Sequence, residues 1–257
     1  MAKSTPQDKY FRYTKLFNRS SSWLLVITVI LPILNAVITN STIDSLLNLI
    51  NFGVMVVYAG ATFFGTFHLL PESENIRRSD YFHNTFGIPT TDDSSEEYFT
   101  NDDIERGFYK MAVNMFENCF FSLKVSSEML LRSMIKMLVF VLILIYFAYN
   151  GFQNNLIALS VLQLFLSTII FGETIKLALY NRNLKRIYNQ IESLFSVKDL
   201  HKNIEGYSPQ IIKLYVSYET NISWGGILLD SDIFNKLNPT LSKKWEQIKK
   251  EFTISKV

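Results

Sequence analysis

Two groups of basic residues have the side chains that proteins use to bind phosphate. Arg77 and Arg78 are adjacent, and Arg182, Lys185 and Arg186 fall in one short stretch further along the chain. Clustered guanidinium and ammonium groups bind anions through charge-assisted hydrogen bonds. The same side chains can instead extend to the anionic headgroups of a membrane. We predict that these residues form the binding site for an anionic ligand.

Polar, uncharged side chains recur within long apolar stretches of the sequence. On a helix with about 3.6 residues per turn, each stretch gathers them on one face. The three faces contain Ser21, Thr28, Asn35 and Thr39; Asn48, Asn51, Met55, Tyr58 and Thr62; and Ser160, Gln163 and Ser167. A polar side chain in hydrocarbon costs free energy unless it faces protein or water, so these faces either bond helix to helix or line a water-filled pore. The predicted pore-lining residues are Thr28, Asn35, Thr39, Asn51, Tyr58 and Thr62.

The rest of the sequence lacks the residue patterns of catalysis or metal binding. Its three histidines, His68, His83 and His201, have no partner at a metal-ligand spacing, and no glycine loop of the phosphate-binding kind is present. The single cysteine, Cys119, leaves no disulfide framework. We therefore expect no catalytic residues, no metal, no cofactor and no enzymatic activity.

Four apolar segments without Asp, Glu, Lys or Arg must position the polar faces: residues 23–39, 46–70, 137–152 and 156–171. An α-helix needs about 20 mostly apolar residues to cross a hydrocarbon layer of roughly 30 Å, and the segments reach that length alone or with flanking residues. Buried helices of a large soluble core are the alternative, which four charge-free runs disfavour. The predicted fold is an all-α membrane protein with four transmembrane helices and cytoplasmic helical extensions.

The 25 Lys and Arg residues predict the orientation of these helices. None of them lies in the short loops 40–45 and 153–155, so the positive-inside rule places both termini and the middle loop in the cytoplasm. The predicted regions are an amphipathic N-terminal tail (1–22), the first two spans (23–70), a cytoplasmic loop with a stalk and a helix (71–133), the last two spans (134–171) and a cytoplasmic helical C-terminal region (172–257).

Helical spacing also predicts the elements on either side of the middle loop. Residues 7–22 mix basic and aromatic side chains and predict a short helix at the membrane surface. Residues 72–84 are expected to continue the second span. A further helix, capped by Thr100, should run on towards the third span. Its apolar stripe consists of Ile104, Phe108, Met111, Met115 and Cys119.

The C-terminal region is expected to be a series of helices. One helix should cover residues 172–195, and Ile211, Leu214, Tyr215 and Tyr218 recur at helical spacing in a second. Gly225-Gly226 and Asn238-Pro239 predict breaks, after which residues 241–252 form a last short helix.

This organisation resembles a family of membrane effectors. The segment DKYFRYTKLFNRSSSW before the first span, the loop 71–133 and the segment NRNLKRIYNQIESLF after the fourth are similar to the SMODS-associated four-transmembrane pore-forming effectors of bacterial antiphage defence. The strongly acidic middle loop departs from that pattern. The resemblance implies a multi-pass protein of the bacterial inner membrane whose pore disrupts the lipid bilayer.

The resemblance also implies partners. The ligand would be a nucleotide or oligonucleotide from a partner nucleotidyltransferase, which opens the pore in most such systems and holds it shut in the Hailong type. Four helices packed together leave little lumen, so we expect a homo-oligomer, with a tetramer as the guess. The alternative is a non-conducting, membrane-anchored module that recruits a cytoplasmic partner protein; a membrane enzyme acting on lipid is a further rival.

Overall fold

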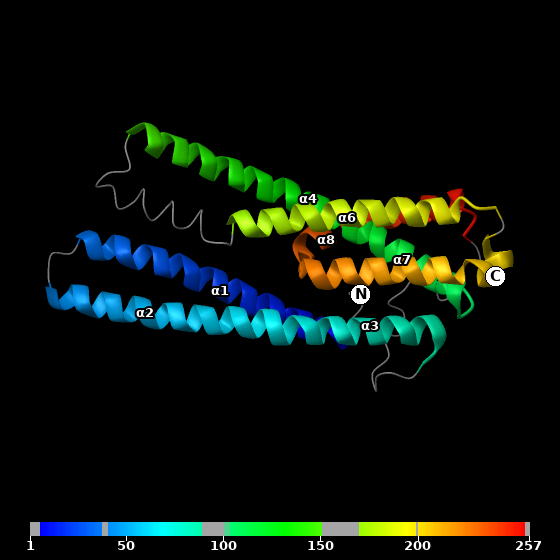
Figure 1. The fold of residues 1–257 in the computed structure, drawn as a ribbon, viewed down its shortest axis with the longest axis horizontal. Helices are drawn as coiled ribbons and strands as arrows, with labels where there is room; N and C mark the ends of the chain where they lie inside the picture. Colours follow the sequence, from blue (N-terminus) through cyan, green and yellow to red (C-terminus); the bar gives the residue numbers. More distant parts are fainter. Residues whose placement is uncertain are drawn as a thin grey trace. The chain divides into compact units, whose positions relative to one another are not determined.

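The computed structural model describes residues 6–37, 41–88, 101, 103–150, 170–198 and 200–254, and these are helical apart from short connections, with no strand among them. The all-α class predicted from the sequence is confirmed (Figure 1). The chain divides into two compact units. We call Lys9–Ser73 with Arg132–Ile175 the apolar unit, and Met1–Asp8, Glu74–Leu131 and Lys176–Val257 the core unit.

The apolar unit contains helices with the composition of membrane spans. It holds most of α1 (Pro6–Val37), all of α2 (Ser41–Phe64) and the second part of α4 (Phe108–Asn150). Two continuous helices among the described residues, Thr42–Phe86 and Phe108–Tyr149, are long and apolar enough to cross a membrane, and their most apolar stretches are exposed. All but the last two residues of the predicted fourth span, 156–171, lie outside the described residues.

The N-terminal segment is not a separate helix, contrary to the prediction for residues 7–22. Helix α1 runs unbroken from Pro6 to Val37, so the segment and the first span form one element. No glycine or proline interrupts the junction. The Ser22 hydroxyl donates to the carbonyl oxygen of Asn18 at 2.9 Å, a bond that is compatible with a continuing helix.

Helix α2 continues beyond its apolar stretch, as predicted. It passes through a π-helical turn, Gly65–Leu69, into α3 (Leu70–Phe86). Gly65 lies against α1: a Cβ atom at Gly65 would stand 3.3 Å from the Asn18 side chain and 3.7 Å from the Cβ of Phe17. The hydroxyls of Thr14 and Ser73 are hydrogen-bonded at 3.2 Å across the same pair of helices.

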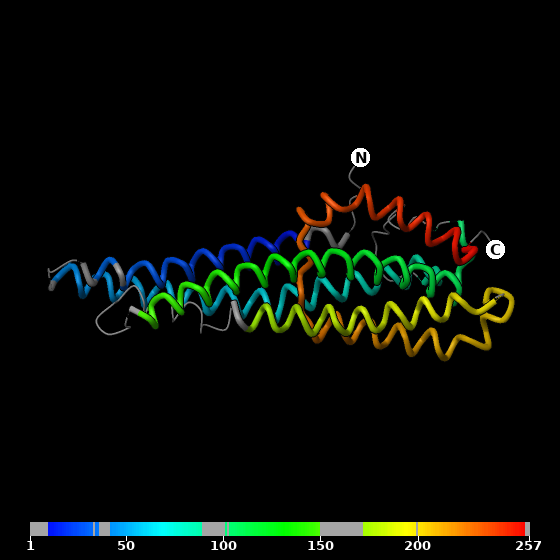
Figure 2. Tube along the Cα trace, turned by 90° about the horizontal axis from the view of Figure 1, so that it is seen from above, coloured from blue at the N-terminus to red at the C-terminus, as the bar shows by residue number. Residues whose placement is uncertain are grey.

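The core unit packs α3, the first part of α4, α6 (Ile170–Phe195), α7 (Ile204–Gly225) and α8 (Ser231–Glu251) around buried aromatic side chains. Figure 2 shows α4 between α8 and the pair formed by α6 and α7. Phe116 on α4 accounts for this position, because its ring contacts Trp245 on one side and Tyr188 and Phe195 on the other. A short 3-10 helix, Leu200–Asn203, connects α6 to α7.

Both apolar stripes predicted for this part of the chain are buried. Ile104, Met111, Met115 and Cys119 are in the core with Phe108 packed against it, and Ile211, Leu214, Tyr215 and Tyr218 line the inner face of α7. The predicted start near Thr100 is wrong, because α4 begins at Phe108. Gly107 has a φ of +141°, which ends any helix before it, and Thr100 itself lies outside the described residues.

The last helix also differs from its prediction. Gly226 ends α7 in a left-handed conformation, which confirms the first predicted break. Helix α8 begins at Ser231 and continues through Pro239, so the second predicted break is wrong. The Asp230 carboxylate caps α8 by accepting from the backbone N–H groups of Asp232 and Ile233. Burial of Ile233, Leu241 and Trp245 offsets the proline cost of about 3 kcal/mol.

Candidate functional site

The polar face predicted for the first two spans lies partly between α1 and α2. The Asn35 amide nitrogen donates to the side-chain oxygen of Asn48 at 3.3 Å, which joins the two helices. Thr28 is buried and donates to the carbonyl oxygen of Leu25 in its own helix at 2.7 Å. The Asn35–Asn48 bond supports the interpretation that part of the face holds helix to helix. Thr39 lies outside the described residues, as do Ser160, Gln163 and Ser167.

Other polar atoms of the same face have no partner. The side-chain oxygens of Ser21, Asn35, Asn51 and Thr62 are buried and make no hydrogen bond within the part of the chain that the structure describes. Tyr58, the remaining predicted pore residue, is half-buried on α2. A buried polar group without a partner costs about 1–3 kcal/mol. Water or a polar group from another subunit would remove that cost.

Arg77 is bound within the core unit rather than free for a ligand. Its Nε atom lies 2.7 Å from a carboxylate oxygen of Glu74, and its Nη2 atom lies 2.5 Å from one of Glu219. Burial by itself lowers the pKa of Arg77, but the two carboxylates outweigh it and hold that pKa well above the usual range of an arginine. The guanidinium is therefore fixed and neutralised by its neighbours on α3 and α7.

Arg78 lies at an open groove between α3 and α7. Its Nη1 atom is 3.3 Å from the hydroxyl of Ser223 and 4.0 Å from a carboxylate oxygen of Glu219. The groove has a volume of about 570 Å³, and its walls are mostly apolar, with Phe82, Tyr215, Val216 and Trp224 among them. The Tyr215 ring stacks on Tyr81 at 5.1 Å and meets Phe82 edge-on at 5.4 Å. This surface suits an apolar occupant with a polar or anionic edge.

The second predicted cluster has a different environment. Arg182, Lys185 and Arg186 are exposed on α6, on the side opposite the buried residues Leu184 and Ile187. They make no hydrogen bond or ion pair with any described residue, so their donors are available. No hydrogen bond or ion pair among the described residues joins this cluster to Arg77 or Arg78.

A buried amide network in the core unit was not predicted from the sequence. The Asn101 amide nitrogen donates to Asn114 at 3.0 Å and to the Glu117 carboxylate at 2.7 Å, and Asn114 donates to Asn84 at 2.9 Å. Asn101 is only 1% exposed. The available signal was the presence of Asn114 and Glu117 among apolar residues of α4. The network holds the chain before α4 against α3 and α4.

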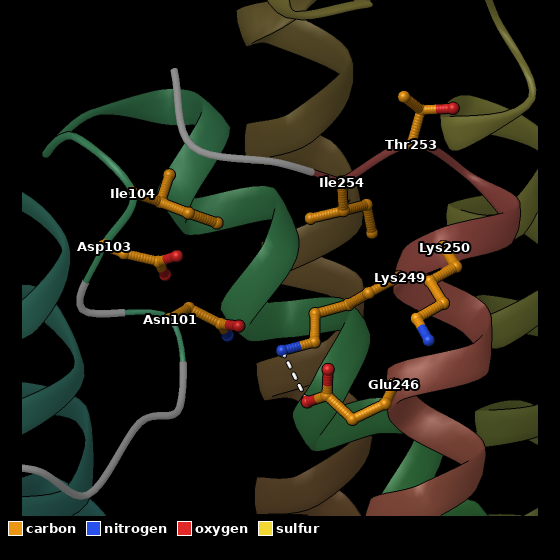
Figure 3. Close-up of a pocket in the computed structure, with 8 residues that line it drawn as sticks. All are labelled: Asn101, Asp103, Ile104, Glu246, Lys249, Lys250, Thr253 and Ile254. Carbon is orange, nitrogen blue, oxygen red and sulfur yellow. Dashed lines mark ion pairs between the residues drawn. The ribbon is translucent and has the colours of Figure 1, made fainter.

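The network borders a polar pocket of about 390 Å³, which Figure 3 shows. Asn101, Asp103 and Ile104 lie on one side of it, and residues of α8 and the chain after it lie on the other. Lys249 is held by Glu246 at 2.6 Å, so one cation is already paired. The mixture of charges suits a small polar molecule rather than a strongly charged one.

Two further properties of the described part of the chain concern metal binding and the reactivity of buried side chains. The described residues contain no group of three His, Cys, Asp or Glu side chains placed to hold a metal ion. Burial raises the pKa of Cys119 and of Tyr218 well above their usual ranges, so the thiol and the phenol remain protonated and unreactive. No protein-family model, curated protein or solved structure matches this chain.

Proposed function

We propose that this chain is the subunit of a homo-oligomeric membrane channel with four spans and cytoplasmic termini. The observation that supports it is the combination of apolar helices exposed on the chain with buried polar atoms that lack partners. In the apolar unit, Ser21, Asn35, Asn51 and Thr62 have this unmet hydrogen-bonding capacity; side chains of the core unit share it, but only those in the spans are separated from water by lipid in this proposal. Within a hydrocarbon layer, water in a pore or a second subunit is the available source of partners.

We further propose that a cytoplasmic ligand controls the channel. Arg182, Lys185 and Arg186 remain the candidates for an anionic ligand, because they are exposed and unpaired within the described chain, whereas Arg77 is neutralised. A nucleotide or oligonucleotide is the ligand class that the resemblance implies, and antiphage defence at the bacterial inner membrane is the implied role. Helix α4 offers a connection between the ligand site and the spans, because it contributes residues to both the core unit and the apolar unit.

Conductance of the purified protein in planar lipid bilayers tests the proposal. We expect discrete currents that depend on protein and that change when a short oligonucleotide is added on the cytoplasmic side. The competing function is a non-conducting anchor that recruits a partner protein, which the Asn35–Asn48 bond favours because it uses a polar pair for packing. Correctly oriented, oligomeric protein without any current would exclude the channel and leave the anchor.

A further inference from the structure

The end of α7 and the turn that follows it form an uncharged, largely apolar stretch of the core unit. Residues 220–229 contain no charged side chain, and the sequence from 224 to 229 is Trp-Gly-Gly-Ile-Leu-Leu. Trp224 is 58% exposed, and Ile227, Leu228 and Leu229 are half-buried. An exposed indole beside aliphatic side chains in an uncharged turn requires an explanation, because water is a poor environment for it.

Contacts within the core unit fix the level of this turn along α3. Tyr215 lies against Tyr81, Glu219 binds Arg77 and Ser223 binds Arg78, so α7 runs antiparallel to α3 and approaches its N-terminal end. Arg78 comes eight residues after Leu70, where α3 begins as a continuation of an apolar helix. At a rise of about 1.5 Å per residue, that distance is roughly 12 Å, which exceeds a headgroup layer of about 5–8 Å, and the turn that follows Ser223 extends back towards the N-terminal end of α3.

The neighbouring helices place the turn at the same level. On α6, the Asn221 amide donates to the carbonyl oxygen of Tyr180 at 3.2 Å, ten residues after that helix begins at Ile170. On α4, the backbone N–H of Asp230 lies 3.4 Å from the sulfur of Met129. Leu131, Met134 and Ile135, which follow Met129, are all more than half exposed. Two of these helices, α3 and α4, are continuous with exposed apolar stretches, and the contacts of the turn lie within about three turns of the points where those stretches begin.

We infer that the α7–α8 turn is an interfacial anchor: Trp224 and Leu228 lie among the headgroups and upper acyl chains of the bilayer. Tryptophan prefers this zone because its ring is apolar and its N–H is a donor. Arg78 is partly exposed at the same groove, and Lys136 and Lys176 are exposed near the starts of the apolar stretches, which suits anionic headgroups. The inference rests on the membrane-spanning part of the proposed function.

Quenching of a fluorescent label by doxyl lipids tests the anchor in the full-length protein. Single cysteines at Leu228→Cys, Val57→Cys and Ser196→Cys would be labelled with bimane on a Cys119→Ala background. The protein would be reconstituted in two kinds of phosphatidylcholine–phosphatidylglycerol vesicles, with the doxyl group high on the acyl chain or near its end, because Val57 lies near the middle of the predicted second span; quenching by either lipid counts as loss of fluorescence. Val57 is exposed on the apolar helix α2, and Ser196 is exposed at the opposite end of α6. We expect loss of fluorescence at positions 57 and 228 and none at 196.

The outcomes separate the anchor from the proposed function. Quenching at 57 without quenching at 228 overturns the anchor and leaves the membrane spans standing. If the cysteines at position 228 of two copies cross-link and the label there is not quenched, the turn contacts another subunit and not lipid, which also overturns the anchor. Equal quenching at 196 and 228 also overturns the anchor, because the turn would then be no closer to the lipid than a control position at the far end of α6. Absence of quenching at 57 removes the spans and the anchor together. Trp224→Cys provides a second label position if Leu228→Cys does not fold.

Discussion

The Nη2 atom of Arg77 on α3 lies 2.5 Å from a carboxylate oxygen of Glu219 on α7, a contact between residues 142 positions apart in the sequence. Glu74 completes the group by binding the Nε atom of the same guanidinium at 2.7 Å. One guanidinium thus pairs with two carboxylates that are largely removed from water. The group ties α7 to the helix that continues directly from α2.

Removal of Arg77 should be more damaging than removal of Glu219. Arg77→Met leaves the Glu74 carboxylate without its partner and Glu219 with only the more distant Arg78, and we expect the free energy of unfolding to fall by about 3–5 kcal/mol. Glu219→Gln keeps Arg77 paired with Glu74 and should cost about 1 kcal/mol. Thermal or chemical unfolding in detergent, followed by circular dichroism, measures both. Equal losses for the two variants would contradict the description of Arg77 as the centre of the group.

Asn35 should affect conductance if its free oxygen faces a pore. Asn35→Leu removes both the free oxygen and the bond to Asn48, whereas Asn48→Leu removes only the bond. We expect Asn35→Leu to reduce single-channel conductance and Asn48→Leu to leave it near the wild-type value. Asn35→Asp should shift ion preference towards cations, because a fixed negative charge attracts them in a narrow lumen.

The same two leucine variants distinguish a pore-lining role of Asn35 from a role in helix packing alone. If Asn35 serves only to join the helices, both leucine variants should weaken assembly or stability alike, by about 1 kcal/mol, and neither should change ion preference. Size-exclusion chromatography in detergent and reversal potentials in asymmetric salt measure the two effects.

Cysteine labelling in intact cells tests the orientation. On a Cys119→Ser background, an impermeant maleimide should label a cysteine at Asp44 or Gln153 and should not label one at Ser94. The reason is that the charged loops stay in the cytoplasm while the short loops cross the membrane. Labelling at Ser94 before lysis would reverse the predicted topology.

The exposed cluster on α6 should determine anion binding. Arg182→Glu together with Arg186→Glu should abolish binding of a short fluorescent oligonucleotide to the protein in detergent while membrane insertion is retained. Lys243→Glu with Lys244→Glu, a charge-matched change at exposed positions of α8, should leave binding unchanged. Equal affinity for wild type and the α6 variant in detergent would favour the interpretation that these residues bind lipid headgroups.

Alkaline pH should destabilise the core unit. Burial raises the pKa of Tyr81 and Tyr218 well above the usual value, whereas the unfolded chain ionises its tyrosines near pH 10. The native state therefore retains protons that the unfolded state loses, and stability falls as the pH rises above about 10. Chemical unfolding at a series of pH values measures the slope. Tyr218→Phe should make the slope shallower, and an unchanged slope would assign the effect to other groups.

Periodic burial made much of the fold predictable. The stripes on α4 and α7 follow from spacing alone, because one helical face must be apolar to be buried. Pro239 was misread because the local cost of a proline is visible in the sequence while the compensating burial of Trp245 is not. The sequence predicts a ligand-binding role for Arg77 because an arginine that binds phosphate and an arginine that binds a carboxylate cannot be told apart in a sequence. Only the distant residue Glu219 separates the two, and spacing carries no information about it.

The core unit is assembled from separated segments of the chain, and this has a consequence for its biosynthesis. Glu74–Leu131 and Lys176–Val257 are interrupted by Arg132–Ile175, so apolar segments emerge from the ribosome before the core can close. Phe116 is synthesised well before Trp245, the ring that covers it. Until α8 is made, that face of α4 is an exposed aromatic surface that a chaperone or the nascent-chain machinery would have to shield. Messages that stop before α8 should therefore yield protein that is degraded rather than partly active.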